Sequence, residues 1–163
     1  MSIVVKLSDV EVLVCRMIGN MRSISSRANK VGDRKMGWQP GYAIDEDGTI
    51  GEYAFCKHFN IFFDPSVSVR SGSYDCLYKG KRIDVKTTRY KEGELIATTK
   101  VNPDVDIFVL AILDEENSTV TFTGYALASE LYKESTLKNF GWGNGHAIKQ
   151  EDLRQWKQDH STQ

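Results

Sequence analysis

Two aspartates and a lysine in the stretch from Ser73 to Thr88 are of the types that metal-assisted chemistry requires. Asp84 and Lys86 are one residue apart, so both side chains share a face if this stretch is a β-strand. Magnesium prefers carboxylate oxygens, and one or two of them usually suffice beside water and phosphate oxygens. The ion polarises a phosphoryl oxygen and activates water, while a neighbouring lysine can orient that water or stabilise developing charge. Asp75, Asp84 and Lys86 are therefore candidates for a site acting on phosphate esters.

The same stretch predicts a β-hairpin that would position these side chains. Runs of aromatic and β-branched residues flank Lys79-Gly80-Lys81, where a glycine suits a positive φ. On the second strand one face would carry Asp84, Lys86 and Thr88, and the other would pack into a core. Asp75, on the first strand, would come close to Asp84 if the hairpin register allows it. An isolated Asp-x-Lys is more often an exposed ion pair of little consequence, so the rest of the chain must decide.

A long amphipathic helix is expected over residues 8–28, after a short strand at 3–5. Ser8 and Glu11 form a capping-box pattern at its start. The apolar residues then recur at helical spacing, and this stripe is expected to face the core. Its members are Val10, Leu13, Val14, Met17, Ile18, Met21 and Ile24.

Residues 29–47 contain several glycines and a Pro-Gly pair, which predicts an irregular basic segment. Its cations and Trp38 could contact a nucleic acid, or the segment could be a solvated linker with one anchoring aromatic. A second helix is expected at about 49–58 and carries Glu52. A carboxylate near a helix N-terminus is favourable even without a ligand. Among the candidates, Glu52 is therefore the one whose position least requires a role in the site.

The rest of the chain predicts strands alternating with helices, the pattern of an α/β fold. Further strands are expected at 67–69, 94–98 and 119–125, and the continuous apolar run of 106–114 predicts a buried strand. Helices are expected at 126–133 and 149–158. The glycine-rich stretch 141–145 lacks the context of a phosphate-binding loop and is interpreted as an irregular connection.

Length and composition favour one soluble domain spanning residues 1–163. No apolar run is long enough to span a bilayer, and no signal-peptide pattern opens the chain. Cys15, Cys56 and Cys76 form no zinc-binding pattern, so a reducing cytoplasm is the expected location. The three histidines are scattered, which argues against a histidine-based nuclease or a catalytic triad.

The net charge of −1 conceals an uneven distribution of charge along the sequence. Lysine and arginine dominate residues 16–35 and 79–91, whereas residues 104–116 are acidic. Such segregation would suit a polyanion lying across one face, although a solvated surface would have the same composition. If the groove exists, the basic stretches should lie on the face of Asp84 and the acidic stretch should point away. The candidate nucleic-acid-binding residues are Arg27, Arg34, Lys35, Lys79, Lys81 and Arg89.

The order of these motifs resembles the PD-(D/E)XK nuclease superfamily, in particular small members of phage or homing type. The resemblance covers about residues 48–130: Gly51-Glu52 on a helix, Tyr74-Asp75 on one strand and Asp84-Val85-Lys86 on the next. Tyr74 stands where the family has proline. The resemblance implies a restriction-endonuclease-like fold, with a central mixed β-sheet flanked by helices.

The same resemblance implies an Mg²⁺-dependent or Mn²⁺-dependent endonuclease that acts on DNA, with a 5′-phosphate and a 3′-hydroxyl as products. Asp75, Asp84 and the backbone carbonyl of Val85 would bind the metal, with Glu52 joining directly or through water. Lys86 would position the attacking water. A homodimer is also implied. RNA or branched or single-stranded DNA as substrate, and a catalytically silent binding module of the same fold, remain alternatives.

Overall fold

The computed structural model describes residues 1–28, 40–67 and 74–157, which form an α/β structure with two β-sheets. The larger sheet is mixed and has five strands in the order β1-β6-β5-β3-β2. Its strands are β1 (Ile3–Lys6), β2 (Cys76–Tyr78), β3 (Lys81–Thr88), β5 (Ile107–Asp114) and β6 (Thr119–Leu127). The smaller sheet is antiparallel in the order β4-β8-β7, with β4 (Leu95–Thr98), β7 (Leu137–Asn139) and β8 (Asn144–Ile148).

Strand β5 lies at the centre of the larger sheet and separates two hydrophobic cores. It pairs in parallel with β3 and antiparallel with β6. Val109, Ala111 and Leu113 belong to the core beneath the helices, whereas Phe108 and Leu110 belong to the core beneath the smaller sheet. The continuous apolar run expected at 106–114 is therefore explained by burial on both faces.

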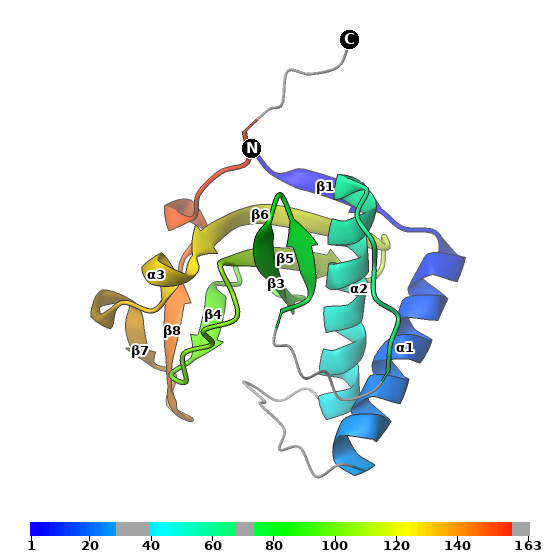
Figure 1. Ribbon diagram of the computed structural model, residues 1–163, viewed down its shortest axis with the longest axis horizontal. Coiled ribbons are helices and arrows are strands. Elements are labelled where there is room, and N and C mark those ends of the chain that lie inside the picture. The colour runs from blue at the N-terminus through cyan, green and yellow to red at the C-terminus, as the bar shows by residue number, and fades with distance from the viewer. Residues whose placement is uncertain (29–39, 68–73, 158–163) are drawn as a thin grey trace.

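Two long helices, α1 (Asp9–Ala28) and α2 (Gly41–Phe59), cover one face of the larger sheet. Figure 1 shows α2 against the sheet and α1 on its outer side, while the smaller sheet and the short α3 (Ala128–Leu131) lie on the opposite side. The predicted capping box begins α1: the Ser8 N–H donates to Glu11 Oε2 at 2.7 Å, and the Glu11 N–H donates to Ser8 Oγ at 3.2 Å.

The prediction that the apolar stripe of α1 faces the core is wrong. The buried residues of α1 are small, namely Cys15, Gly19 and Ser23. At Gly19 the helices are so close that an added Cβ would lie 2.6 Å from the Cα of Glu46 in α2. This close packing of backbones favours small side chains at the contact and leaves every member of the predicted stripe except the half-buried Ile18 exposed.

Two other boundaries differ from the prediction. Helix α2 begins at Gly41, directly after Pro40, so residues 41–47 are helical rather than part of an irregular segment. The expected terminal helix at 149–158 is absent from its described part: residues Gln150–Asp152 form a single 3₁₀ turn, and Arg154 then pairs with Tyr125 of β6. The strand expected at 67–69 lies mostly outside the described residues, and Val67 itself is not in a strand.

The other expected strands are present at 3–6, 95–98, 107–114 and 119–127, and the helix expected at 126–133 is shorter, at 128–131. Within the glycine-rich stretch 141–145, Gly141 and Gly143 lie in the turn of a β7–β8 hairpin, whereas Asn144 and Gly145 begin β8, and this hairpin was not predicted. Among the described residues, no helix combines the length and hydrophobicity required to cross a bilayer.

Candidate active site

The predicted hairpin exists and holds Asp75 against the strand that carries the other candidates. Strands β2 and β3 are joined at Tyr78 and Lys81 by a two-residue turn in which Lys79 and Gly80 both have positive φ. This is the conformation that such tight hairpins favour. Beyond the paired residues of β2, the Asp75 N–H donates to the Ile83 carbonyl at 2.8 Å, and Asp75 Oδ2 accepts from the Val85 N–H at 2.7 Å. Asp75 is thus fixed to β3 by its backbone and its side chain.

Asp84 and Lys86 project from the same face of β3, as the alternation predicts. Lys86 Nζ lies 2.8 Å from Asp84 Oδ1 and donates a hydrogen bond to Oδ2 at 3.1 Å. The ammonium is also 5.8 Å from the centre of the Phe108 ring on the neighbouring strand β5. Asp84 is buried, and Lys86 is partly exposed. The carboxylate therefore lies inside the fold while the lysine reaches outward from it.

Glu52 is brought to this strand by an unusually close approach of α2. An added Cβ at Gly51 would lie 2.0 Å from Thr87 Oγ1 on β3, so only glycine fits at this contact. The adjacent Glu52 accepts a hydrogen bond from Arg22 Nη1 at 3.0 Å. Arg22 in turn donates to the carbonyls of Asp64 and Ser66, at 2.7 and 3.1 Å. One arginine of α1 thereby fixes the position of the Glu52 side chain.

The carboxylates of this group repel one another. Burial raises the pKa of Asp75 well above its usual range, and the nearby charges of Glu52 and Asp84 raise it further. The hydrogen bond from the Val85 N–H and the charge of Lys86 oppose this rise without cancelling it. For Lys86, burial lowers the pKa, but the negative charge of Asp84 outweighs it, so the pKa is raised and the lysine stays protonated. The rise in the pKa of Asp75 thus reflects a buried position beside two other carboxylates.

All four predicted catalytic residues line one cavity of about 480 Å³. Glu52 comes from α2, Asp75 from the segment before β2, and Asp84, Val85 and Lys86 from β3. The opposite wall belongs to the other core and to the smaller sheet. Residues that form it include Ile96, Thr98, Lys100, Asn102 and Tyr132. The cavity therefore lies where the two sheets face each other.

Carboxylate oxygens are the ligands that a hard divalent cation prefers, but the site offers few of them. Over residues 1–28, 40–67 and 74–157, no group of three or more His, Cys, Asp or Glu side chains is arranged to hold a metal ion. Asp75 and Asp84 would supply two carboxylates, which is the number that magnesium commonly takes from a protein. Asp84 Oδ1 is buried and lies 2.8 Å from Lys86 Nζ without a well-aligned hydrogen bond, so a bound ion would compete with this lysine for the carboxylate. These two residues could hold an ion that draws its other ligands from the backbone, water and substrate.

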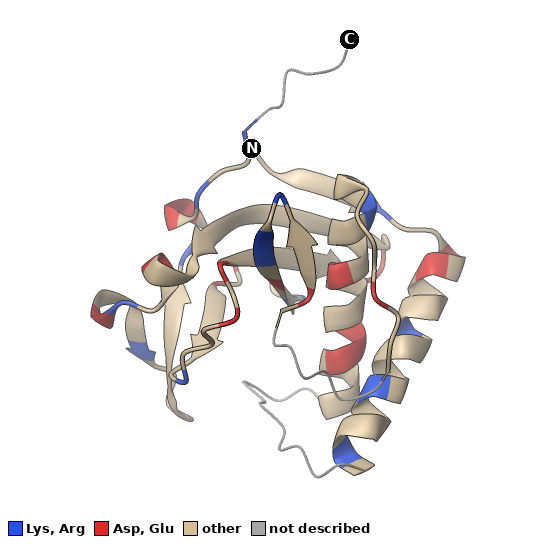
Figure 2. Cartoon of the chain, viewed as in Figure 1, with Lys and Arg blue, Asp and Glu red and all other residues tan. Residues whose placement is uncertain are grey.

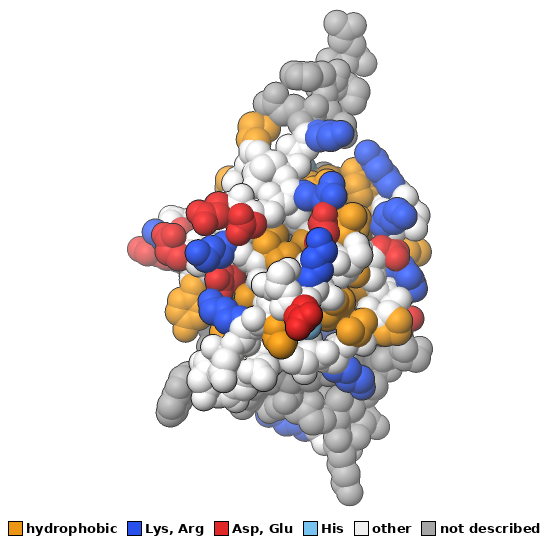
Figure 3. Space-filling view, turned by 90° about the vertical axis from the view of Figure 1, so that its left-hand side faces the viewer, with side chains coloured by type: hydrophobic (Ala, Val, Ile, Leu, Met, Phe, Trp, Pro, Cys, Tyr) orange, Lys and Arg blue, Asp and Glu red, His pale blue; other side chains and the backbone are white. Residues whose placement is uncertain are grey.

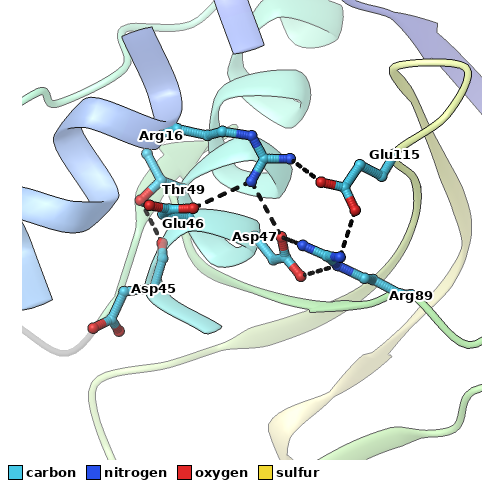
Figure 4. A network of polar contacts seen from close by, with 7 residues as sticks. All are labelled: Arg16, Asp45, Glu46, Asp47, Thr49, Arg89 and Glu115. Atoms are coloured by element: carbon cyan, nitrogen blue, oxygen red, sulfur yellow. Dashed lines mark hydrogen bonds and ion pairs between the residues drawn. The ribbon is translucent and has the colours of Figure 1, made fainter. Parts of the chain in front are cut away.

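The structure describes four of the six candidate nucleic-acid-binding residues, and one of these four, Arg89, is engaged within the fold. Arg27 is exposed in the last turn of α1, and Lys79 and Lys81 are exposed at the hairpin turn. The Arg89 guanidinium instead binds the buried Asp47 of α2 through two hydrogen bonds of 2.6 and 2.9 Å. Figure 4 shows Arg89, Arg16 and Glu115 closing a network around that carboxylate. Arg34 and Lys35 lie outside the described residues.

The basic stretches were expected on the face of Asp84 and the acidic stretch on another face, but the described residues of these stretches lie side by side. Glu115 pairs with Arg16 at 2.8 Å and also with Arg89. Asp106 binds Arg82 of the hairpin through its carboxylate at 2.9 Å. Figure 2 shows acidic and basic positions close together around α2 and the hairpin, and Figure 3 shows them intermixed on the side of the smaller sheet. Charges that are separated along the sequence are thus paired in the fold.

Two groups of site residues were not found by sequence reasoning. Arg22 organises Glu52, but arginine in an amphipathic helix carries no distinguishing local signal. The wall formed by Thr98, Lys100 and Tyr132 depends on the contact between the two sheets, which is remote in sequence.

Comparison of the chain with models of protein families, with curated proteins and with solved structures found no match.

Proposed function

We propose that this protein is a metal-dependent endonuclease of restriction-endonuclease-like fold that hydrolyses DNA. The observation that carries the proposal is the convergence of Glu52, Asp75, Asp84 and Lys86 on one cavity from three separate segments of the chain. Core packing alone does not require three carboxylates and a lysine in one place, and burying charge is costly unless it serves a purpose. The order of these residues and their elements also matches the pattern of PD-(D/E)XK nucleases.

In this proposal Asp75 and Asp84 hold Mg²⁺ or Mn²⁺, with the Val85 carbonyl and Glu52 completing the protein's share of the ligands. When bound, the ion would lower the pKa of a coordinated water and offset the negative charge of a phosphodiester. Lys86, protonated beside Asp84, would orient the attacking water and stabilise the charge that develops on the phosphate. Arg22 keeps Glu52 in place through its 3.0 Å hydrogen bond.

Exposed cations would hold the substrate. Arg27, Lys79 and Lys81 are exposed, and Arg34 and Lys35 belong to the same proposed set. Arg89 is removed from it, because its guanidinium is used by Asp47 and Glu115. RNA and branched or single-stranded DNA would use the same metal site, since substrate choice depends on the surface around the cavity.

Cleavage assays with and without Mg²⁺ test the proposal directly. The substrates are plasmid DNA, single-stranded DNA, a four-way junction and RNA. Cleavage of a DNA substrate that needs Mg²⁺, is lost in Asp84→Asn and persists in Glu116→Gln is the expected result. Glu116 is exposed and does not line the cavity, so its variant is a matched control for loss of one negative charge.

A catalytically silent binding module is the second candidate, and the ion pair between Lys86 and Asp84 favours it because the lysine already neutralises one carboxylate. Binding of DNA without cleavage of any substrate in Mg²⁺ or Mn²⁺ would establish that alternative and refute the nuclease.

A further inference from the structure

Helix α1 presents six large apolar side chains to solvent along one side. Their exposed fractions range from 46% at Val14 to 69% at Val10. The other members are Leu13, Met17, Met21 and Ile24. We call this set the α1 stripe. A contiguous apolar surface of this kind on a soluble protein commonly marks an interface with another macromolecule.

The spacing within the α1 stripe is that of a helix-pairing seam. Val10, Val14, Met17, Met21 and Ile24 follow one another at intervals that alternate between four and three residues. This is the repeat by which two helices pack side chains against each other along a shared seam. The opposite face of α1 is already occupied by α2, through Cys15, Gly19 and Ser23. The stripe is thus suited to a second helix with the same spacing, such as another copy of α1.

The charges beside the stripe favour an antiparallel pair. Asp9 and Arg27 are both exposed, and they are about five helical turns apart, so they lie on the same flank of the stripe. A two-fold axis near Met17 would bring Asp9 of one copy close to Arg27 of the other at both ends of the seam. In a parallel pair, Asp9 would instead lie beside Asp9 of the other copy, and Arg27 beside Arg27. In an antiparallel pair the two helix dipoles attract each other, which also favours this orientation.

The exposed area is sufficient for a dimer. From the exposed fractions, the six side chains together present on the order of 600 Å², so two copies would bury on the order of 1,200 Å², the lower limit of stable interfaces. Figure 1 shows α1 at the outer edge of the molecule, with α2 between it and the sheet. None of the six residues of the α1 stripe lines the cavity of the candidate active site.

We infer that the protein forms a homodimer in which the α1 stripes of two copies pack antiparallel about a two-fold axis near Met17. This inference rests on the exposed helix and not on the proposed nuclease activity. Val10 then lies opposite Ile24 of the second copy, and the two Met17 side chains meet at the centre. The interface is small, so the dimer exchanges with monomer at low concentration.

Molar mass measured by light scattering and by sedimentation over a range of concentrations tests the dimer. The unaltered chain should have twice the monomer mass at high concentration. Met17→Glu would place two carboxylates together in an apolar seam and should raise the dissociation constant about a hundredfold or more. Phe62→Glu is the matched control, because Phe62 is 81% exposed but does not belong to the stripe. A monomeric unaltered chain at all concentrations, or a dimer unaffected by Met17→Glu with unchanged circular dichroism, would overturn the inference.

Cross-linking tests the antiparallel orientation. Cys15, Cys56 and Cys76 are buried, so a cysteine added to the stripe is the accessible one. With diamide as oxidant, Met17→Cys should form a covalent dimer, whereas Val10→Cys alone should not. A mixture of Val10→Cys and Ile24→Cys chains should cross-link to each other. Cross-linking of Val10→Cys with itself, and none in the mixture, would show a parallel pair and refute the proposed geometry.

Discussion

Gly51→Ala should destabilise the protein because α2 has no room for a methyl group where it meets β3. The new Cβ would lie 2.0 Å from Thr87 Oγ1 and 3.2 Å from Thr87 Cβ. Thr87 is β-branched, lies in strand β3 and has a buried hydroxyl oxygen, so it has little freedom to rotate away. Overpacking a core costs about 1–3 kcal/mol, and the higher helix propensity of alanine offsets about 1 kcal/mol. Since the overlap is severe, we expect a net loss of about 2 kcal/mol in the free energy of unfolding.

Urea denaturation of a double-mutant cycle isolates the contact. Thr87→Ala removes the hydroxyl oxygen, which is buried and has no hydrogen-bond partner among the described residues, so little polar stabilisation is lost. In that background Gly51→Ala should be nearly neutral, which gives a coupling energy of about 2 kcal/mol. Gly48→Ala is the control in the same helix, because nothing lies within 4 Å of its added Cβ. It should stabilise the protein by about 1 kcal/mol. If Gly51→Ala behaved like Gly48→Ala, the close approach of α2 to β3 would be refuted.

Three further changes have distinct expected outcomes. Lys86→Ala removes no metal ligand, so calorimetry should show unchanged Mn²⁺ affinity while plasmid cleavage falls about a hundredfold or more. Asp47→Asn leaves Arg89 without its buried carboxylate and should lower the free energy of unfolding in urea by about 2 kcal/mol. Burial raises the pKa of Glu11, but its bonds to Lys57 and neighbouring donors outweigh this and lower it from 4.5 to about 2. Its stabilisation is therefore present above pH 4.5 and lost toward pH 2, so Glu11→Gln should cost about 1 kcal/mol at pH 7 and nothing near pH 2.

Matched variants keep these tests specific. Lys157→Ala removes an exposed lysine that does not line the cavity, and it should cleave as the unaltered chain does. Normal cleavage by Lys86→Ala would reduce that lysine to a structural ion-pair partner. A constant effect of Glu11→Gln from pH 7 to pH 2 would show that packing, rather than the charge of Glu11, provides the stabilisation.

The hairpin and the residues on it could be predicted because their signals are local. Gly80 in the turn and the alternation along 83–88 specify which side chains share a face, and the structure places Asp84 and Lys86 together accordingly. The proximity of Asp75 required only the hairpin register. Glu52 lies in the same cavity because α2 approaches β3 closely at Gly51. No sequence pattern indicates that Thr87 is the residue that Gly51 contacts. The strand at 107–114 was also predictable, since burial on both faces requires a continuous apolar run.

The errors arose where tertiary contacts override local preference. Amphipathicity showed that α1 has an apolar side, but it did not show that the small residues around Gly19 would be the buried ones. The glycines and the Pro-Gly pair of residues 29–47 predicted an irregular segment, yet α2 already begins at Gly41. The segment after residue 149 has a helical pattern, but Arg154 pairs with Tyr125 through two backbone hydrogen bonds of 3.0 and 2.9 Å. Distant pairing of this kind has no signature within the segment itself.

The pairing of β1 with β6 also restricts the order in which the chain can fold during its synthesis. Ile3 lies opposite Phe122, so β1 has no partner until β6 has also been synthesised. At about 5–20 residues per second, that delay lasts on the order of ten seconds. Throughout this interval β1 is an unpaired strand next to a helix with an exposed apolar side, which is a combination prone to association with other nascent chains. We therefore expect folding yield in the cell to depend on chaperones that bind β1 and α1.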